Sequence, residues 1–139
     1  DTLEALAQGG TPFLGICLGL QLFFPESEEA GGEGLGFMDG RVVSLPEGVK
    51  RPHMGWNTLH IEGDNELLDG VEEGSYVYFA HSYYPLPRDP GIVIARTDYG
   101  VSFPSALAKG DIYGTQFHPE KSGKVGFQIL KNFLKIVER

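Results

Sequence analysis

The chain has 139 residues and a formal net charge of −8, with 41% hydrophobic and 22% charged residues. This length allows one packed domain, and the composition is that of a globular protein rather than a disordered or fibrous one. No stretch gathers enough Lys and Arg to follow a phosphate backbone, which excludes nucleic acid and acidic membrane surfaces as partners.

The first part of the sequence predicts a helix, a strand, a second helix and a loop. Apolar residues of 1–8 recur on one helical face, and a Gly-Gly pair ends that helix. The compact apolar run 12–16 has the length of a strand, and 18–24 then takes on helical character. The stretch 26–36 is rich in Glu and Gly, so it is predicted to be a surface loop.

The remainder predicts short strands and one long helix. Turn residues separate six β-rich segments, which are 41–45, 56–61, 76–83, 92–97, 105–108 and 112–117. In the last element, 124–137, apolar residues recur at helical spacing, and we expect this stripe to pack on the sheet. Its members are Phe127, Leu130, Leu134 and Val137. Together these elements predict one α/β unit over 1–139, with a mixed sheet flanked by helices.

Cysteine content and hydropathy indicate the compartment. The longest apolar run, 13–24, is interrupted by polar and glycine residues and is too short to cross a bilayer. Cys17 is the single cysteine, so no internal disulfide can form, and the first residues do not resemble a secretory signal. We therefore expect a cytoplasmic protein.

The strongest local signal is a nucleophile between two glycines. Gly15, Cys17 and Gly19 lie where the predicted strand passes into the predicted helix. This is the pattern of a nucleophile elbow, a strained turn that exposes its central side chain. A side chain at either glycine is expected to collide across so tight a turn, and a helix start beneath the sulfur favours the thiolate. A buried, inert cysteine is the alternative, but a core position requires neither glycine.

A cysteine nucleophile needs a base, and an imidazole base needs a group that orients it. His118 and Glu120 supply both, because residues i and i+2 of an extended segment project to one side and Pro119 disfavours helical geometry at His118. The pair follows the strand predicted at 112–117, and strand ends are where α/β proteins place their sites. A surface turn would explain His-Pro-Glu alone, but the elbow favours catalysis.

The other histidines, His53, His60 and His81, are not spaced with Cys17 or with one another as metal ligands. We therefore predict no metal and no cofactor. His60 lies in an alternating stretch typical of a half-exposed strand. His53 and His81 lie among aromatic residues, and they can be either hydrogen-bonded core residues or ligand contacts.

These motifs resemble those of the class I glutamine amidotransferases. The residues at 15–21, Gly-Ile-Cys-Leu-Gly-Leu-Gln, and at 116–122, Gln-Phe-His-Pro-Glu-Lys-Ser, match the family's nucleophile and histidine-glutamate motifs. Two further segments, 52–57 and 78–84, are similar to those of glutaminase subunits of imidazole glycerol phosphate synthases, which serve histidine biosynthesis. The resemblance runs from the first residues to the last helix and implies a flavodoxin-like fold.

The resemblance also implies roles for individual residues. Cys17 would attack the glutamine amide, His118 would transfer protons and Glu120 would orient His118, giving a thioester that water hydrolyses. The main-chain N–H of Leu18 would be one oxyanion donor. The positions that match glutamine-holding residues are Gln21, Glu29, Ser82 and Tyr83.

A cyclase is the heterodimer partner that the resemblance implies. It would take the released ammonia and form imidazole glycerol phosphate together with AICAR. The positions that match the surface facing this partner are His53, Met54, Trp56, Asn57, Tyr78 and Lys121.

Family members carry strand and helix units before the nucleophile motif, among them a Pro-Gly-rich oxyanion strand. No such segment precedes Cys17 here, so we expect an N-terminally incomplete domain with an uncovered strand edge.

Three alternatives stay open. One is a glutaminase subunit that feeds anthranilate, aminodeoxychorismate or guanylate synthesis, against which segments 52–57 and 78–84 argue. Another is a thiol hydrolase of similar fold that needs no partner. The third is a non-catalytic binding subunit, which would require neither the cysteine nor the His-Glu pair.

Overall fold

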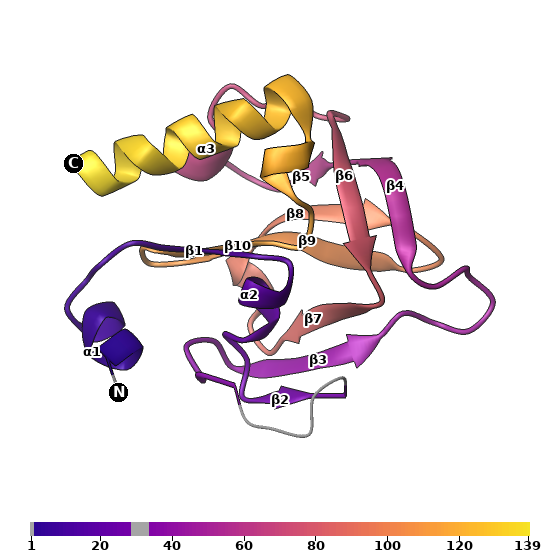
Figure 1. Cartoon of the computed structure of the whole chain (residues 1–139), viewed down its shortest axis with the longest axis horizontal. Coiled ribbons are helices and arrows are strands. Elements are labelled where there is room, and N and C mark those ends of the chain that lie inside the picture. Colours follow the sequence, from indigo (N-terminus) through magenta and orange to yellow (C-terminus); the bar gives the residue numbers. More distant parts are fainter. Residues whose placement is uncertain (1, 29–33) are drawn as a thin grey trace.

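The structure is a computed structural model that describes residues 2–28 and 34–139, and it is built around a five-stranded mixed sheet (Figure 1). The order of its strands is β1 (Phe13–Ile16), β10 (Ile112–Thr115), β9 (Ser102–Lys109), β8 (Val93–Asp98) and β5 (His60–Ile61). The outer strand β1 runs parallel to β10, and all other pairs are antiparallel. The C-terminal ends of β1 and β10 therefore lie side by side.

Two smaller sheets complete the β structure. The first contains β2 (Glu26–Ser27), β3 (Gly40–Ser44) and β7 (Tyr83–Pro87), and the second pairs β4 (His53–Thr58) with β6 (Tyr76–His81). Only Ser82 separates β6 from β7, so the chain passes from one sheet to the other at this residue. The main-chain oxygen of Ser82 accepts a hydrogen bond from the N–H of Leu45 (2.9 Å), which fixes the crossing.

The helices lie on both sides of the five-stranded sheet. They are α1 (Thr2–Gln8), α2 (Leu18–Gln21) and α3 (Gly123–Glu138), with short 3-10 helices η1 (Glu66–Leu68), η2 (Pro90–Ile92) and η3 (Pro119–Lys121). In Figure 1, α3 lies on one side of the sheet, and α2 lies on the other with the three-stranded sheet. Within 2–28 and 34–139, no helix is long and apolar enough to span a membrane.

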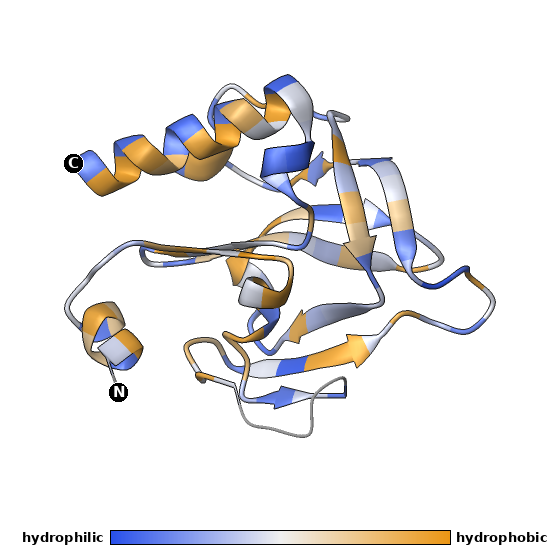
Figure 2. Cartoon of the chain, in the orientation of Figure 1, coloured by the Kyte–Doolittle hydropathy of each residue, from blue (hydrophilic) through white to orange (hydrophobic). Residues whose placement is uncertain are grey.

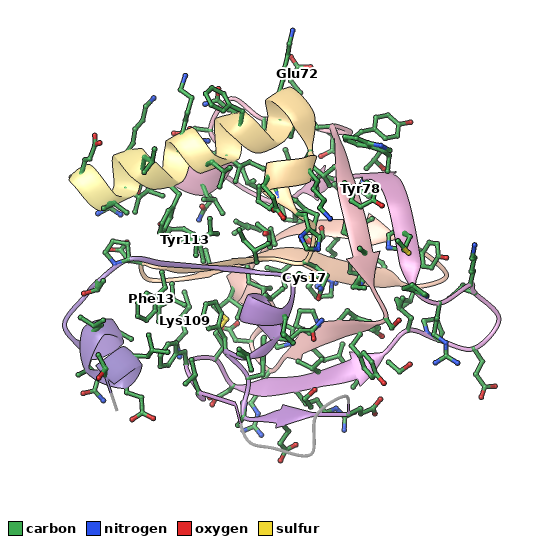
Figure 3. All side chains as sticks on the ribbon, in the orientation of Figure 1. Phe13, Cys17, Glu72, Tyr78, Lys109 and Tyr113 are labelled. Carbon is green, nitrogen blue, oxygen red and sulfur yellow. The ribbon has the colours of Figure 1, made fainter. Side chains whose placement is uncertain are left out.

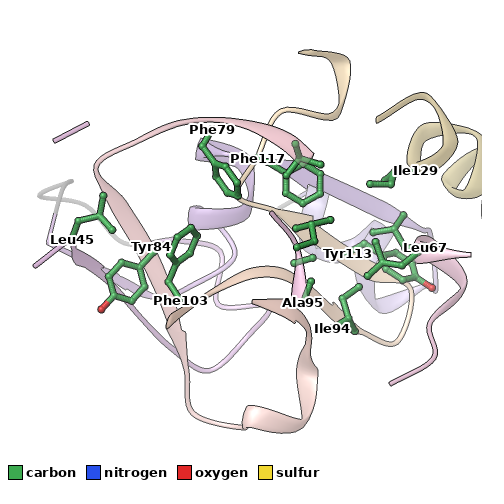
Figure 4. Packing of buried hydrophobic residues seen from close by; sticks show 14 of the residues in the cluster. Leu45, Leu67, Phe79, Tyr84, Ile94, Ala95, Phe103, Tyr113, Phe117 and Ile129 are labelled. Atoms are coloured by element: carbon green, nitrogen blue, oxygen red, sulfur yellow. The ribbon is translucent and has the colours of Figure 1, made fainter. Parts of the chain in front are cut away.

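Buried apolar side chains pack on both faces of the sheet. In the larger cluster, Phe79 meets Phe103 and Phe117 edge to face, with ring centroids 5.6 and 5.9 Å apart (Figure 4). The smaller cluster surrounds Leu20 of α2. Gly114 of β10 admits this leucine, because a Cβ at Gly114 would overlap its side chain. The close contact holds α2 against the sheet and thereby fixes the turn before it.

The predicted packing face of the last helix is wrong. Figure 2 shows hydrophobic and hydrophilic residues alternating along α3, which carries apolar residues on two sides. Phe127, Leu134 and Val137 of the predicted stripe are exposed. The buried positions are Gly126, Ile129, Asn132 and Ile136. Gly126 decides the face, because only a residue without a side chain can approach the Pro119 carbonyl of η3 so closely.

Other predicted elements change at their ends. The run predicted helical over 18–24 is helical only over Leu18–Gln21, and the predicted loop 26–36 contains the two-residue strand β2. The segment 56–61 begins earlier, at His53, and is interrupted at Leu59. The apolar face predicted for α1 stays exposed at Leu3 and Leu6.

Candidate active site

Cys17 lies in the sharp turn between β1 and α2, as the two flanking glycines predicted. Its φ of 55° and ψ of −102° place it in a region that non-glycine residues rarely adopt. Among the described residues, it is the only non-glycine residue with a positive φ. Its main-chain N–H donates to the oxygen of Thr115 (2.7 Å), which anchors the turn to β10. Backbone strain of this kind is typical of functional sites.

The two glycines of the turn differ in their steric need. A Cβ at Gly15 would lie 2.7 Å from the Phe23 ring and 2.8 Å from the main chain of Gly19. A Cβ at Gly19 would meet nothing within 4 Å. The predicted collision is therefore confirmed at Gly15 and wrong at Gly19, because the turn brings the Gly19 backbone, and not its side-chain position, toward β1.

This difference gives a matched pair of stability variants. We expect Gly15→Ala to destabilise the fold by about 1–3 kcal/mol through overpacking. Gly19→Ala should be neutral or slightly stabilising, by up to about 1 kcal/mol, since Ala is the better helix former. Urea unfolding of both variants measures the difference. If Gly15→Ala unfolds at the wild-type urea concentration, the proposed close packing of the turn is incorrect.

The Cys17 sulfur lies between the ends of β6 and β10 (Figure 3). The thiol donates to the main-chain oxygen of Ala80, and the side-chain amide of Gln116 donates to the sulfur, both at 3.6 Å. Gln116 is fully buried and was not singled out from the sequence, although it opens the motif 116–122. Gln116 is buried because it directly follows β10 inside the fold. The motif alone does not show on which side of the chain its side chain lies.

His118 and Glu120 form a hydrogen-bonded pair directly after β10. Nδ1 of His118 lies 2.8 Å from Oε2 of Glu120, and the main-chain N–H of His118 donates to the oxygen of Tyr78 (2.9 Å). His118 is extended, as predicted, but Glu120 belongs to the turn η3 and not to an extended segment. A carboxylate on Nδ1 keeps the proton there and directs Nε2 to another partner.

Strand geometry brings this pair and the cysteine to one edge of the sheet. Ile16 of β1 is in register with Thr115 of the parallel strand β10. Cys17 follows Ile16 by one residue, and His118 follows Thr115 by three. Both therefore lie at the same edge of the sheet. A thiol, an imidazole and a carboxylate at one edge are the groups that nucleophilic acyl transfer uses.

A pocket of about 320 Å³ opens beside the sulfur. Its lining brings together Cys17, Leu18, Gln21, Pro52, Ala80, His81, Ser82 and Tyr83. Of the predicted glutamine-binding residues, Gln21, Ser82 and Tyr83 are present, and Glu29 lies outside the described residues. Gln21 is only 6% exposed and is not a surface amide. Its Nε2 donates to the main-chain oxygen of Tyr83 (3.2 Å) and to Oε1 of Gln116 (3.4 Å).

The residues predicted to face a partner divide into two groups. Met54 and Trp56 are 63% and 55% exposed on the outer side of the β4–β6 pair. The rings of Trp56 and Tyr78 meet edge to face at 5.9 Å, and Nζ of Lys121 lies 5.9 Å from the Tyr78 ring centroid. These four residues form a surface that we call the aromatic face.

The two other predicted interface residues lie on the opposite side of β4. His53 is buried, whereas Asn57 is half-buried and its side-chain amide donates to the main-chain oxygen of Asp98 (3.0 Å). Strand alternation is the reason, because residues 53, 55 and 57 project to the side opposite Trp56. The burial of His53 contradicts its assignment to the interface, whereas Asn57, which is half-buried, stays a prediction.

The chain matches a family model described as Glutamine amidotransferase class-I over residues 1–137. It is 58% identical to imidazole glycerol phosphate synthase subunit HisH of Archaeoglobus fulgidus, covering 100% of this chain and 70% of that protein. It is 51% identical to the subunit of the same name from Geobacillus thermodenitrificans, covering 99% of this chain and 67% of the relative.

Solved structures agree in fold. A Thermoplasma acidophilum protein described as a GMP synthase subunit is similar with a TM-score of 0.72 at 23% identity, over 97% of this chain and 61% of that one. A structure described as a glutamine amidotransferase is similar with a TM-score of 0.71 at 19% identity, over 100% of this chain and 68% of the other. The mixed α/β fold expected from the sequence is confirmed.

Proposed function

Because the chain belongs to the class I glutamine amidotransferase family, we propose that it is the glutaminase that supplies ammonia for imidazole glycerol phosphate formation in histidine biosynthesis. The observation that carries this proposal is an elbow cysteine that lines a pocket of about 320 Å³ and leaves the same edge of the sheet as the His118–Glu120 pair. The names of the relatives support this pathway over anthranilate, aminodeoxychorismate or guanylate synthesis.

In the proposed reaction, the Cys17 sulfur attacks the side-chain amide carbon of glutamine. His118 accepts the thiol proton and returns it to the leaving nitrogen, so ammonia departs and a thioester remains. Water activated by His118 then hydrolyses the thioester to glutamate. Glu120 holds Nδ1 at 2.8 Å, which keeps Nε2 available for each transfer. The main-chain N–H of Leu18, next to the nucleophile, donates to the oxyanion.

The pocket wall supplies the contacts for glutamine. Ser82 and Tyr83 line it together with Cys17, and the side-chain amide of Gln21, which also lines it, donates to the Tyr83 oxygen. A second subunit, the cyclase, uses the ammonia, and we place its docking site on the aromatic face. A cytoplasmic location for this heterodimer is part of the same proposal, since a single reduced cysteine serves as nucleophile.

Dependence on the partner is the experiment that tests this function. We expect glutamine turnover to be low without the cyclase and to rise when the cyclase and its substrate are present, because the partner supplies contacts that favour the competent state. Trp56→Ala should reduce this stimulation by about tenfold or more, as an exposed aromatic anchor does at an interface.

Phe127→Ala is the matched control. Phe127 is an aromatic side chain of α3 that is 64% exposed and is not one of the four residues of the aromatic face, so the stimulation should not change. Full turnover without any partner would instead favour a thiol hydrolase that acts alone.

A further inference from the structure

Two histidines that the proposed reaction does not use are buried at the pocket, and one of them, His81, lines it. His53 of β4 and His81 of β6 are in register, and they are only 4% and 5% exposed. Nδ1 of His53 lies 2.9 Å from Nε2 of His81. The His53 ring stacks on Phe79 and on Tyr99, with centroids 4.6 and 3.8 Å apart. The stacking and the hydrogen bond between the two imidazoles therefore fix the rings of His53 and His81 in place.

Their partners determine where each proton lies. Nδ1 of His81 faces the main-chain oxygen of Tyr83 at 2.9 Å, and a carbonyl can only accept, so this nitrogen carries a proton. In a neutral ring Nε2 of His81 then accepts from Nδ1 of His53. Nε2 of His53 accepts in turn from the side-chain amide of Asn57 (3.2 Å). The result is a directional relay from Asn57 through His53 and His81 to Tyr83.

The surroundings keep both rings neutral. Burial lowers the pKa of His53 to about 4. Burial is also the largest cause that lowers the pKa of His81 to about 4; its bond to Tyr83 opposes this, and the charges of His53 and His118 add to it. At neutral pH neither ring is charged, so each keeps one donor and one acceptor, as the relay requires.

The relay ends on the wall of the pocket. Tyr83 offers one carbonyl oxygen, which accepts from both His81 and Gln21. At the other end of this wall, the oxygen of Ala80 accepts from the Cys17 thiol. Residues 80–83, which include His81, are thus held to the nucleophile through Ala80 and to β4 through the hydrogen bond between His81 and His53.

We propose that His53 and His81 are positioning residues for glutamine, because their relay fixes the 80–83 wall relative to the Cys17 sulfur. This inference rests on the proposed function. A purely structural core would be filled at less cost by apolar rings, since buried polar groups must be desolvated. Here each ring nitrogen instead has a partner, and the bonds lead to one main-chain group of the pocket.

His53→Phe tests the relay in the complete protein assayed with its cyclase partner. Phenylalanine keeps the ring between Phe79 and Tyr99 but removes both hydrogen bonds. We expect the KM for glutamine to rise by about tenfold or more, with kcat changed by less than about threefold, because binding geometry and not chemistry is lost. His53→Gln, which restores one donor and one acceptor, should recover most of the lost affinity.

Tyr99→Phe is the control for stability. It keeps the stacked ring and removes only the hydrogen bond from the Tyr99 hydroxyl to the Lys50 oxygen (2.6 Å), so it should lower Tm without changing KM. An unchanged KM in His53→Phe, in an enzyme whose wild type hydrolyses glutamine, would overturn the positioning role and leave the proposed function intact. A wild-type complex that does not hydrolyse glutamine would refute the proposed function and this role together.

A second measurement does not depend on turnover. Nitrogen-15 NMR of the histidine rings at neutral pH should show both His53 and His81 neutral and protonated on Nδ1. A proton on Nε2 of His81 would contradict the relay.

Discussion

Cys17→Ala should abolish glutamine hydrolysis while leaving the fold intact. The strand-to-helix turn places the Cys17 sulfur at the pocket, where it is the proposed nucleophile. Alanine has no sulfur and cannot form the thioester. Loss of the nucleophile of a coupled set of residues costs on the order of a thousandfold or more in rate. Steady-state glutaminase assays in the presence of the cyclase measure this loss.

Two controls separate chemistry from structure in this experiment. Thermal unfolding of Cys17→Ala should match the wild type, since alanine at a φ of 55° bears a strain similar to that of cysteine. The cyclase reaction of the same complex should continue when ammonium salt is supplied, because ammonia then bypasses the glutaminase. A Cys17→Ala protein with normal glutaminase activity would remove this residue from the mechanism.

The parts of the site that the sequence predicted are those fixed by local chemistry. A tight strand-to-helix turn needs a glycine where the chain folds back on itself, and Gly15 meets this need. The His118–Glu120 pair is two residues apart, so its contact does not depend on distant packing. The ends of β1 and β10 then meet because parallel neighbours share one edge.

The parts that could not be predicted depend on tertiary contacts. The buried side of α3 is chosen by the approach of Gly126 to Pro119 and by Asn132, whose amide donates to the oxygens of Leu67 and Asp69. Periodicity alone favours either apolar side of this helix equally. Gln116 is a similar case, since its position between Cys17 and Gln21 requires the fold.

His53 shows a different source of error. Its place in the segment 52–57 suggested an interface, yet strand alternation puts it opposite the exposed Trp56. A motif match assigns a segment to a function, whereas the side of the strand decides which residues of that segment reach the surface.

His118→Ala should lower the rate of glutamine hydrolysis by about a hundred- to ten-thousandfold, the usual contribution of a general acid–base. Glu120→Gln should lower it less, because glutamine can still accept from Nδ1 of His118 and loses only the negative charge. That charge stabilises the imidazolium that forms when the thiol proton is transferred. Turnover of the two variants with the cyclase present gives the order of the effects.

A second His–Glu pair supplies the matched control. Nδ1 of His60 lies 3.0 Å from Oε2 of Glu73 on the exposed surface, so Glu73→Gln makes the same chemical change outside the pocket. This variant should hydrolyse glutamine at the wild-type rate. Equal rates for wild type and Glu120→Gln would remove Glu120 from the catalytic group. A larger loss in Glu120→Gln than in His118→Ala would mean that the carboxylate itself, and not the imidazole, moves the proton.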